Sequence, residues 1–124
     1  MESKKNKLPK AVKHLEAAIK LYKTNKSELY FLTLAKTFET VVEYVWRELK
    51  RLVEDQGLEA PAPKMAIKEA ARLKFISEPE IWLDCIDARN NSVHDYFGIS
   101  EPEYCELAED ILRLIKKSTL ADLL

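Results

Sequence analysis

The stretch SELYFLTLAKTFETVVEYVWRELKRLVEDQG, residues 27–57, decides the fold because its apolar residues recur every three or four positions. That spacing predicts one long amphipathic helix over residues 27–56, with Gly57 placed to end it. Trp46 widens the apolar side of this helix. The apolar stripe consists of Leu34, Phe38, Val41, Val45, Leu49 and Leu52.

Four shorter helices are predicted around the long one, since no period-two alternation typical of β-strands persists in the sequence. They cover residues 9–24, 64–74 behind Pro63, 78–93 and 101–117. The first should bury Leu8, Val12, Leu15, Ile19 and Tyr22, and the last Tyr104, Leu107, Ala108, Ile111, Leu114 and Ile115. Short connectors between such helices predict an all-α fold, an antiparallel four- to five-helix bundle. For residues 118–124, a docked and a frayed conformation both remain open.

The tetrapeptide SEPE occurs twice, at residues 77–80 and 100–103. In a capping box, the serine hydroxyl accepts a hydrogen bond from the backbone N–H three residues later, and the glutamate there reaches back to the serine N–H. We therefore expect a capping box, and the start of a helix, at each SEPE.

Composition indicates a globular protein with one domain, residues 1–124. The chain has 47% hydrophobic and 33% charged residues and a formal net charge of -1. This charge is weak evidence against general nucleic-acid binding, and RNA contact would need a local basic patch, such as residues 2–13 or 46–51. No apolar run approaches the ~20 residues that span a bilayer, so we expect a cytoplasmic protein without membrane contact. Cys85 and Cys105 lack CxxC spacing and are expected to be core thiols.

The polar stretch DARNNSVHDYFG, residues 87–98, concentrates the side chains that could carry chemistry. Arg89 interrupts the apolar stripe of the fourth helix, so its charge needs compensation. It could pair with an aspartate of its own helix (Asp84 or Asp87) or with a glutamate of a neighbouring one. It could instead face a cleft that receives an anion.

His94 would point some 140° away from Arg89 on a continuous helix, at about 100° per residue. The two could share a site only if the helix ends near Asn90 and Asn91, or if two chains build the site together. Alternatively, His94 caps the helix and Tyr96 is an ordinary packed aromatic residue.

Other polar side chains suggest no second site. His14 lies off the apolar stripe of its helix, which is typical of a surface residue. Glu43 and Arg47 have the i,i+4 spacing of an ordinary helix-stabilising pair. A di-metal bundle would need Glu-x-x-His pairs, and the sequence has none.

The segment RNNSVHDY, residues 89–96, fits the R-x4-H-x-Y signature of HEPN domains, small helical proteins encoded beside minimal nucleotidyltransferases in prokaryotes. The chain resembles their nucleotidyltransferase substrate-binding branch over about residues 31–115. Three further blocks carry the resemblance: FETVVEYVWRELKRLVEDQG (38–57), APKMAIKEAARLKFI (62–76) and EIWLDCIDARNNSVHDY (80–96). Asp95 stands where this branch often has serine or threonine, and Cys85 where methionine is common.

The resemblance implies a homodimer or higher homo-oligomer with Arg89 and His94 of both chains lining a cleft. It implies a partner subunit of a nearby-encoded minimal nucleotidyltransferase in a toxin-antitoxin type system, needing no cofactor or metal. The alternative is a metal-independent ribonuclease. His94 would then be its general acid or base, and Arg89 would stabilise the phosphorane. Asn90 and Asp95 would support the phosphate site, and AMP addition to Tyr96 would inhibit the enzyme.

Overall fold

This computed structural model describes residues 7–92 and 100–124. Within them lie five α-helices and one short 3₁₀ helix. The elements are α1 (Leu8–Thr24), α2 (Glu28–Asp55), α3 (Pro63–Arg72), α4 (Pro79–Ser92), α5 (Glu101–Lys116) and η1 (Thr119–Leu123). These ranges contain no β-strand, and the predicted all-α helical bundle is confirmed.

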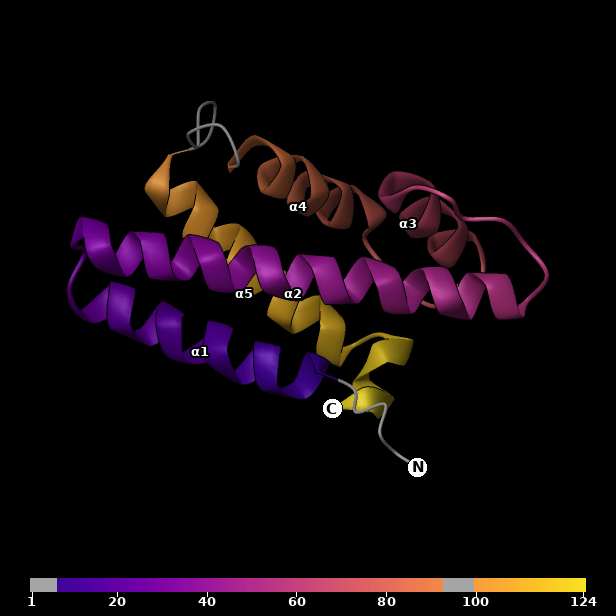
Figure 1. The fold of residues 1–124 in the computed structure, drawn as a ribbon, viewed down its shortest axis with the longest axis horizontal. Coiled ribbons are helices and arrows are strands. Elements are labelled where there is room, and N and C mark those ends of the chain that lie inside the picture. Colours follow the sequence, from indigo (N-terminus) through magenta and orange to yellow (C-terminus); the bar gives the residue numbers. More distant parts are fainter. Residues whose placement is uncertain (1–6, 93–99) are drawn as a thin grey trace.

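The long helix α2 runs through the whole bundle, and the other helices lie around it (Figure 1). In this view α1 lies on one side of α2, α3 and α4 lie on the other side, and α5 crosses behind. Helix α1 packs against α2 and α5, while α4 packs against α2, α3 and α5. Consequently α1 and α4 present their outward faces in different directions.

The inner side of α2 forms the centre of the core, as its spacing predicted. All residues of the predicted stripe are buried except Leu52, which is partly exposed but packs against the core. The predicted inner residues of α1 are also buried, and Leu15 is 0% exposed. At about 25 cal/mol per Å² of apolar surface, this burial is the main term that stabilises the bundle.

Helix ends follow local chemistry at most of the predicted positions. The hydroxyl of Ser27 accepts a hydrogen bond from the N–H of Tyr30 at 3.1 Å and caps α2. Gly57, with φ of 84°, follows the end of α2 in the left-handed conformation that glycine adopts without strain. The predicted capping box of Ser100 and Glu103 is present at the start of α5.

The prediction of a second capping box, at residues 77–80, is wrong. Helix α4 begins at Pro79, and Glu78 before it has a φ of 54°. The carboxylate of Glu78 pairs with Arg113 of α5 at 3.1 Å, and the carbonyl oxygen of Ser77 accepts a hydrogen bond from the buried indole of Trp82 at 2.8 Å. Tertiary contacts therefore override the capping signal.

The carboxyl-terminal segment is docked. Leu120 of η1 is 0% exposed, and the N–H of Thr119 donates a hydrogen bond to the carbonyl oxygen of Phe75, in the turn between α3 and α4, at 3.0 Å. Cys85 and Cys105 are both buried and free, which confirms them as core thiols. Burial raises the pKa of both thiols, so neither is a ready nucleophile.

Candidate functional site

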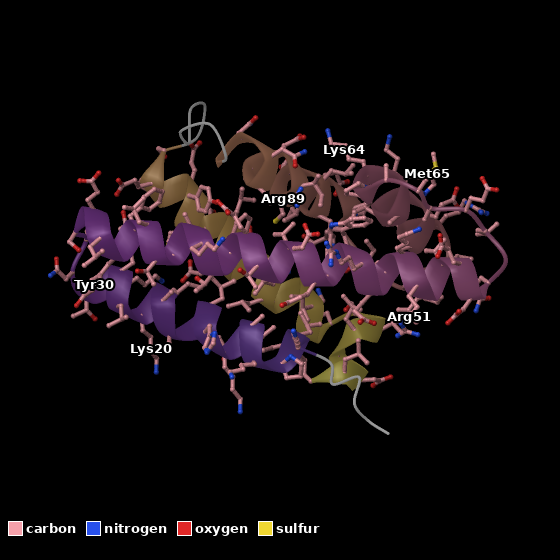
Figure 2. The ribbon with its side chains drawn as sticks, in the orientation of Figure 1. Lys20, Tyr30, Arg51, Lys64, Met65 and Arg89 are labelled. Carbon is pink, nitrogen blue, oxygen red and sulfur yellow. The ribbon has the colours of Figure 1, made fainter. Side chains whose placement is uncertain are left out.

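Arg89 lies in the last turn of α4, and its guanidinium extends toward α2 (Figure 2). Its Nη2 donates a hydrogen bond to Oε1 of Glu43, and its Nη1 donates one to Oδ1 of Asn90 at 3.0 Å. The side chains of Arg89 and Glu43 are 31% and 22% exposed. Of the alternatives that the sequence left open, the structure therefore shows pairing with a glutamate of a neighbouring helix. Asp87 instead pairs with Lys64 of α3 at 2.6 Å.

The carboxylate of Glu43 is shared. Its Oε2 lies 2.6 Å from Nη2 of Arg47, and its Oε1 accepts a hydrogen bond from the indole N–H of Trp46 at 3.3 Å. The i,i+4 pair with Arg47 is thus present as predicted, but Glu43 also joins α2 to α4 through Arg89. Two guanidinium groups are oriented by one carboxylate.

A shallow, open depression of about 490 Å³ lies where this ion cluster meets solvent. It is lined by Glu43 and Arg89 together with Lys36, Glu39, Thr40, Tyr44 and Arg47 of α2. We call it the α2/α4 pocket. Its lining combines three cations with two carboxylates, a phenol and a hydroxyl group. Because arginine and lysine bind phosphate oxygens, and carboxylates accept hydrogen bonds from sugar hydroxyls, the pocket suits a phosphorylated, hydroxyl-bearing ligand.

The structure brings together two of the predicted site residues, Arg89 and Asn90. His94, Asp95 and Tyr96 lie outside the described residues, as does Val93. His14 is exposed on α1, as predicted for a surface residue. In the part of the chain that the structure describes, no three acidic, histidine or cysteine side chains form a cluster suited to a metal ion.

Sequence reasoning missed the role of α2 in this site. Glu43 was assigned to an ordinary helix pair, although it lies on the same side of α2 as Lys36 and Arg47, at spacings of seven and four residues. Charged residues that recur on one side of α2, next to its apolar stripe, were the sequence signal that could have pointed to this site. Its link to Arg89 joins residues 46 positions apart, which periodicity alone does not reveal.

Residues 4–118 match the family described as nucleotidyltransferase substrate binding protein like. The chain belongs to this family. The match includes all the residues of the α2/α4 pocket and the whole signature segment, residues 89–96. A comparison with curated proteins finds no matching sequence.

Membership of the substrate-binding family agrees with the predicted branch and relates the protein to a nucleotidyltransferase. Within residues 7–92 and 100–124, none of the helices combines the length and the apolar character needed to cross a bilayer. In this family member, Arg89 of the signature segment lines the α2/α4 pocket.

Proposed function

We propose that this protein is the substrate-binding partner subunit of a minimal nucleotidyltransferase encoded beside it, in a two-gene system of the toxin-antitoxin type. Family membership supports the nucleotidyltransferase relationship. The observation that carries the proposal is Arg89, which Glu43 orients at the edge of the α2/α4 pocket.

In this proposal the α2/α4 pocket receives the phosphate of a nucleotide or RNA end. Lys36, Arg47 and Arg89 supply positive charge, and the planar fork of an arginine can contact two phosphate oxygens at once. Glu43 restrains both guanidinium groups, so less conformational entropy is lost when they bind. Glu39 and Thr40, which also line the pocket, would contact sugar hydroxyls.

The proposed site is completed by a second copy of the chain, so that Arg89 and His94 of both copies line one cleft. A single continuous helix would direct these two side chains some 140° apart, at about 100° per residue, whereas a twofold axis removes that difficulty. Exposed leucines next to the pocket support this arrangement. Leu29 and Leu32 are 68% and 42% exposed, and they lie seven and four residues before Lys36, on the same side of α2. Burial of these leucines would favour dimerisation.

The alternative function is that of a metal-independent ribonuclease, inhibited when the nucleotidyltransferase adds AMP to Tyr96. The oriented guanidinium of Arg89 favours it, because preorganised donors stabilise the charge that develops on a phosphorane. His94 would transfer the proton of the attacking ribose hydroxyl, and Asn90 and Asp95 would support the site.

Incubating the purified protein with cellular RNA in a chelator tests the alternative. Arg89→Ala and His94→Ala should each reduce cleavage at least about 100-fold, the usual effect of losing one transition-state donor or a general base. Arg51→Ala, an exposed arginine of α2 outside the pocket, is the control and should cleave like the wild type. Cleavage that survives both site variants would rule the ribonuclease out.

Adding the neighbouring nucleotidyltransferase with ATP tests the partner function. We expect the two proteins to co-purify, and intact mass to increase by AMP in the wild type and in Arg51→Ala but not in Tyr96→Phe. If the two proteins neither associate nor react, the partner function is wrong. Light scattering of Leu29→Lys tests the dimer, which this substitution should dissociate.

A further inference from the structure

The outward face of α1 carries lysines that the α2/α4 pocket does not use. Lys10, Lys13 and Lys20 are exposed, and at about 100° per residue they project from the same side of the helix, opposite its buried side. Figure 2 shows Lys20 directed away from α1 into solvent, on the other side of α2 from Arg89. We call these three residues the α1 lysine face.

The lysines of the α1 lysine face lack ion-pair partners among the described residues around them. Within the part of the chain that the structure describes, Lys10, Lys13 and Lys20 form no ion pair. The acidic residue of α1, Glu16, is directed toward α5, where it pairs with Lys116 at 3.0 Å. Lys23 also lies on the α5 side, paired with Glu109. Lys10, Lys13 and Lys20 therefore have no ion-pair partner among the described acids of α1 and α5.

The basic segment at residues 46–51 behaves differently. Arg47 pairs with Glu43 at 2.6 Å, and Lys50 pairs with Glu54 at 2.5 Å. Arg51 lies between Glu48 and Asp55, at 2.9 and 3.5 Å. Every cation of this segment already has a carboxylate, so releasing counterions from a polyanion would gain little there. The sequence offered two local basic patches, residues 2–13 and 46–51. Among the described residues, only the first of them has lysines without an ion-pair partner, and these lie on α1.

We propose that the α1 lysine face binds the sugar-phosphate backbone of single-stranded RNA. Lys10 to Lys20 spans about 15 Å of helix, at about 1.5 Å per residue, and several phosphates of one strand fit within that length. The three lysines carry flexible ammonium groups, which contact phosphates without reading bases.

Two other kinds of binding partner fit the α1 lysine face less well. An amphipathic membrane helix needs a free apolar side, but that side of α1 is buried against α2 and α5, with Leu8 and Leu15 at 0% exposed. Protein interfaces are depleted in lysine and enriched in aromatic residues and arginine, unlike this face. The choice of RNA rests on the proposed function, because its ribonuclease alternative acts on RNA.

Fluorescence anisotropy with a labelled single-stranded RNA, measured over a series of salt concentrations, tests the inference. The α1 variant carries Lys10→Gln, Lys13→Gln and Lys20→Gln. The control variant, with the same change of net charge on another exposed surface, carries Lys64→Gln, Lys68→Gln and Lys74→Gln. We expect the α1 variant to bind at least about tenfold more weakly. Its salt slope should be smaller by about 2, roughly 0.7 for each phosphate that the variant no longer neutralises. The control should keep the slope of the wild type.

Three results would overturn the inference: no binding by the wild type, an equal loss of affinity in both variants, or tighter binding of a polyglutamate peptide than of RNA. The last would indicate an acidic protein as the partner. Arg89→Ala separates this inference from the proposed function. If Arg89→Ala abolishes RNA binding and the α1 variant does not, the inference fails while the pocket function survives. If the α1 variant loses RNA binding but the wild type neither cleaves RNA nor associates with a nucleotidyltransferase, the inference survives and the proposed function fails.

Discussion

The α2/α4 pocket and the α1 lysine face both present cations to solvent, but they hold them in opposite ways. In the pocket, Arg47 and Arg89 share the carboxylate of Glu43, which orients them and cancels part of their charge. On α1, Lys10 and its neighbours have no ion-pair partner among the described residues, so they keep their full charge and their rotational freedom. Ion pairing fixes the orientation of the arginines but weakens their electrostatic field, which suits a specific binding site. Unpaired lysines keep a stronger field, which suits non-specific attraction of anions.

The largest expected effect comes from removing the packing that supports the α1 lysine face. Leu15→Ala should destabilise the protein by about 2–5 kcal/mol, because the fully buried leucine leaves a cavity. Urea unfolding followed by circular dichroism measures it. Leu21→Ala, on the same helix but 45% exposed, is the matched control and should cost less than about 1 kcal/mol. Equal losses would mean that α1 is not packed as described.

A smaller effect is expected in the pocket. Glu43→Gln removes the carboxylate that two arginines share, so we expect a loss of about 1–2 kcal/mol, near the lower end for hydrogen bonds to charged groups. Glu16→Gln, which breaks the more exposed pair with Lys116, should cost at most about 1 kcal/mol. If the Glu43 variant is as stable as the wild type, the carboxylate does not orient Arg89.

On the inner side of α1, Tyr22 should make the stability of the protein depend on pH. The hydroxyl of Tyr22 donates a hydrogen bond to Glu101 at 2.7 Å; burial, followed by this bond, raises the pKa of Tyr22 to about 12 from 10.0. The unfolded chain ionises first, so the contribution of Tyr22 is complete below pH 10 and is lost as pH rises toward 12. Tyr22→Phe should cost about 1 kcal/mol at pH 7. Between pH 10 and 12, its stability should decrease less than that of the wild type; parallel curves would contradict this pKa.

The smallest effect should follow substitution on the α1 lysine face itself. Lys13→Gln should change the free energy of unfolding by no more than about 0.5 kcal/mol, because the side chain is exposed and forms no ion pair with any described residue. Thermal unfolding measures it. A clear destabilisation would show that this lysine has a structural role and would weaken its assignment to a binding surface.

Most of the fold was predictable because it depends on local periodicity. The stripe of α2, the cap at Ser100 and the stop at Gly57 are all signals carried by neighbouring residues. Glu78 shows the limit of such signals. The same four letters that cap α5 do not cap α4, since Arg113 and Trp82 hold that segment in another conformation. A local pattern cannot reveal a contact with a helix 35 residues away.

The candidate site was predictable in part. Arg89 stood out because a charge in an apolar stripe must be compensated, and the structure shows that compensation. Its partner was not predictable, because α2 contains several glutamates and only the packing of α4 against α2 selects Glu43. The proposed roles of His94, Asp95 and Tyr96 still depend on the signature.

The docked carboxyl-terminal segment has a consequence for how the chain folds during synthesis. The turn before α4 receives a backbone hydrogen bond from Thr119, and α1 is tied to α5 through Tyr22 and Glu16. Helix α1 must therefore wait for α5 to be synthesised before its contacts are complete. Folding cannot proceed simply from one end of the polypeptide to the other, and a nascent chain halted before α5 should remain open to proteases.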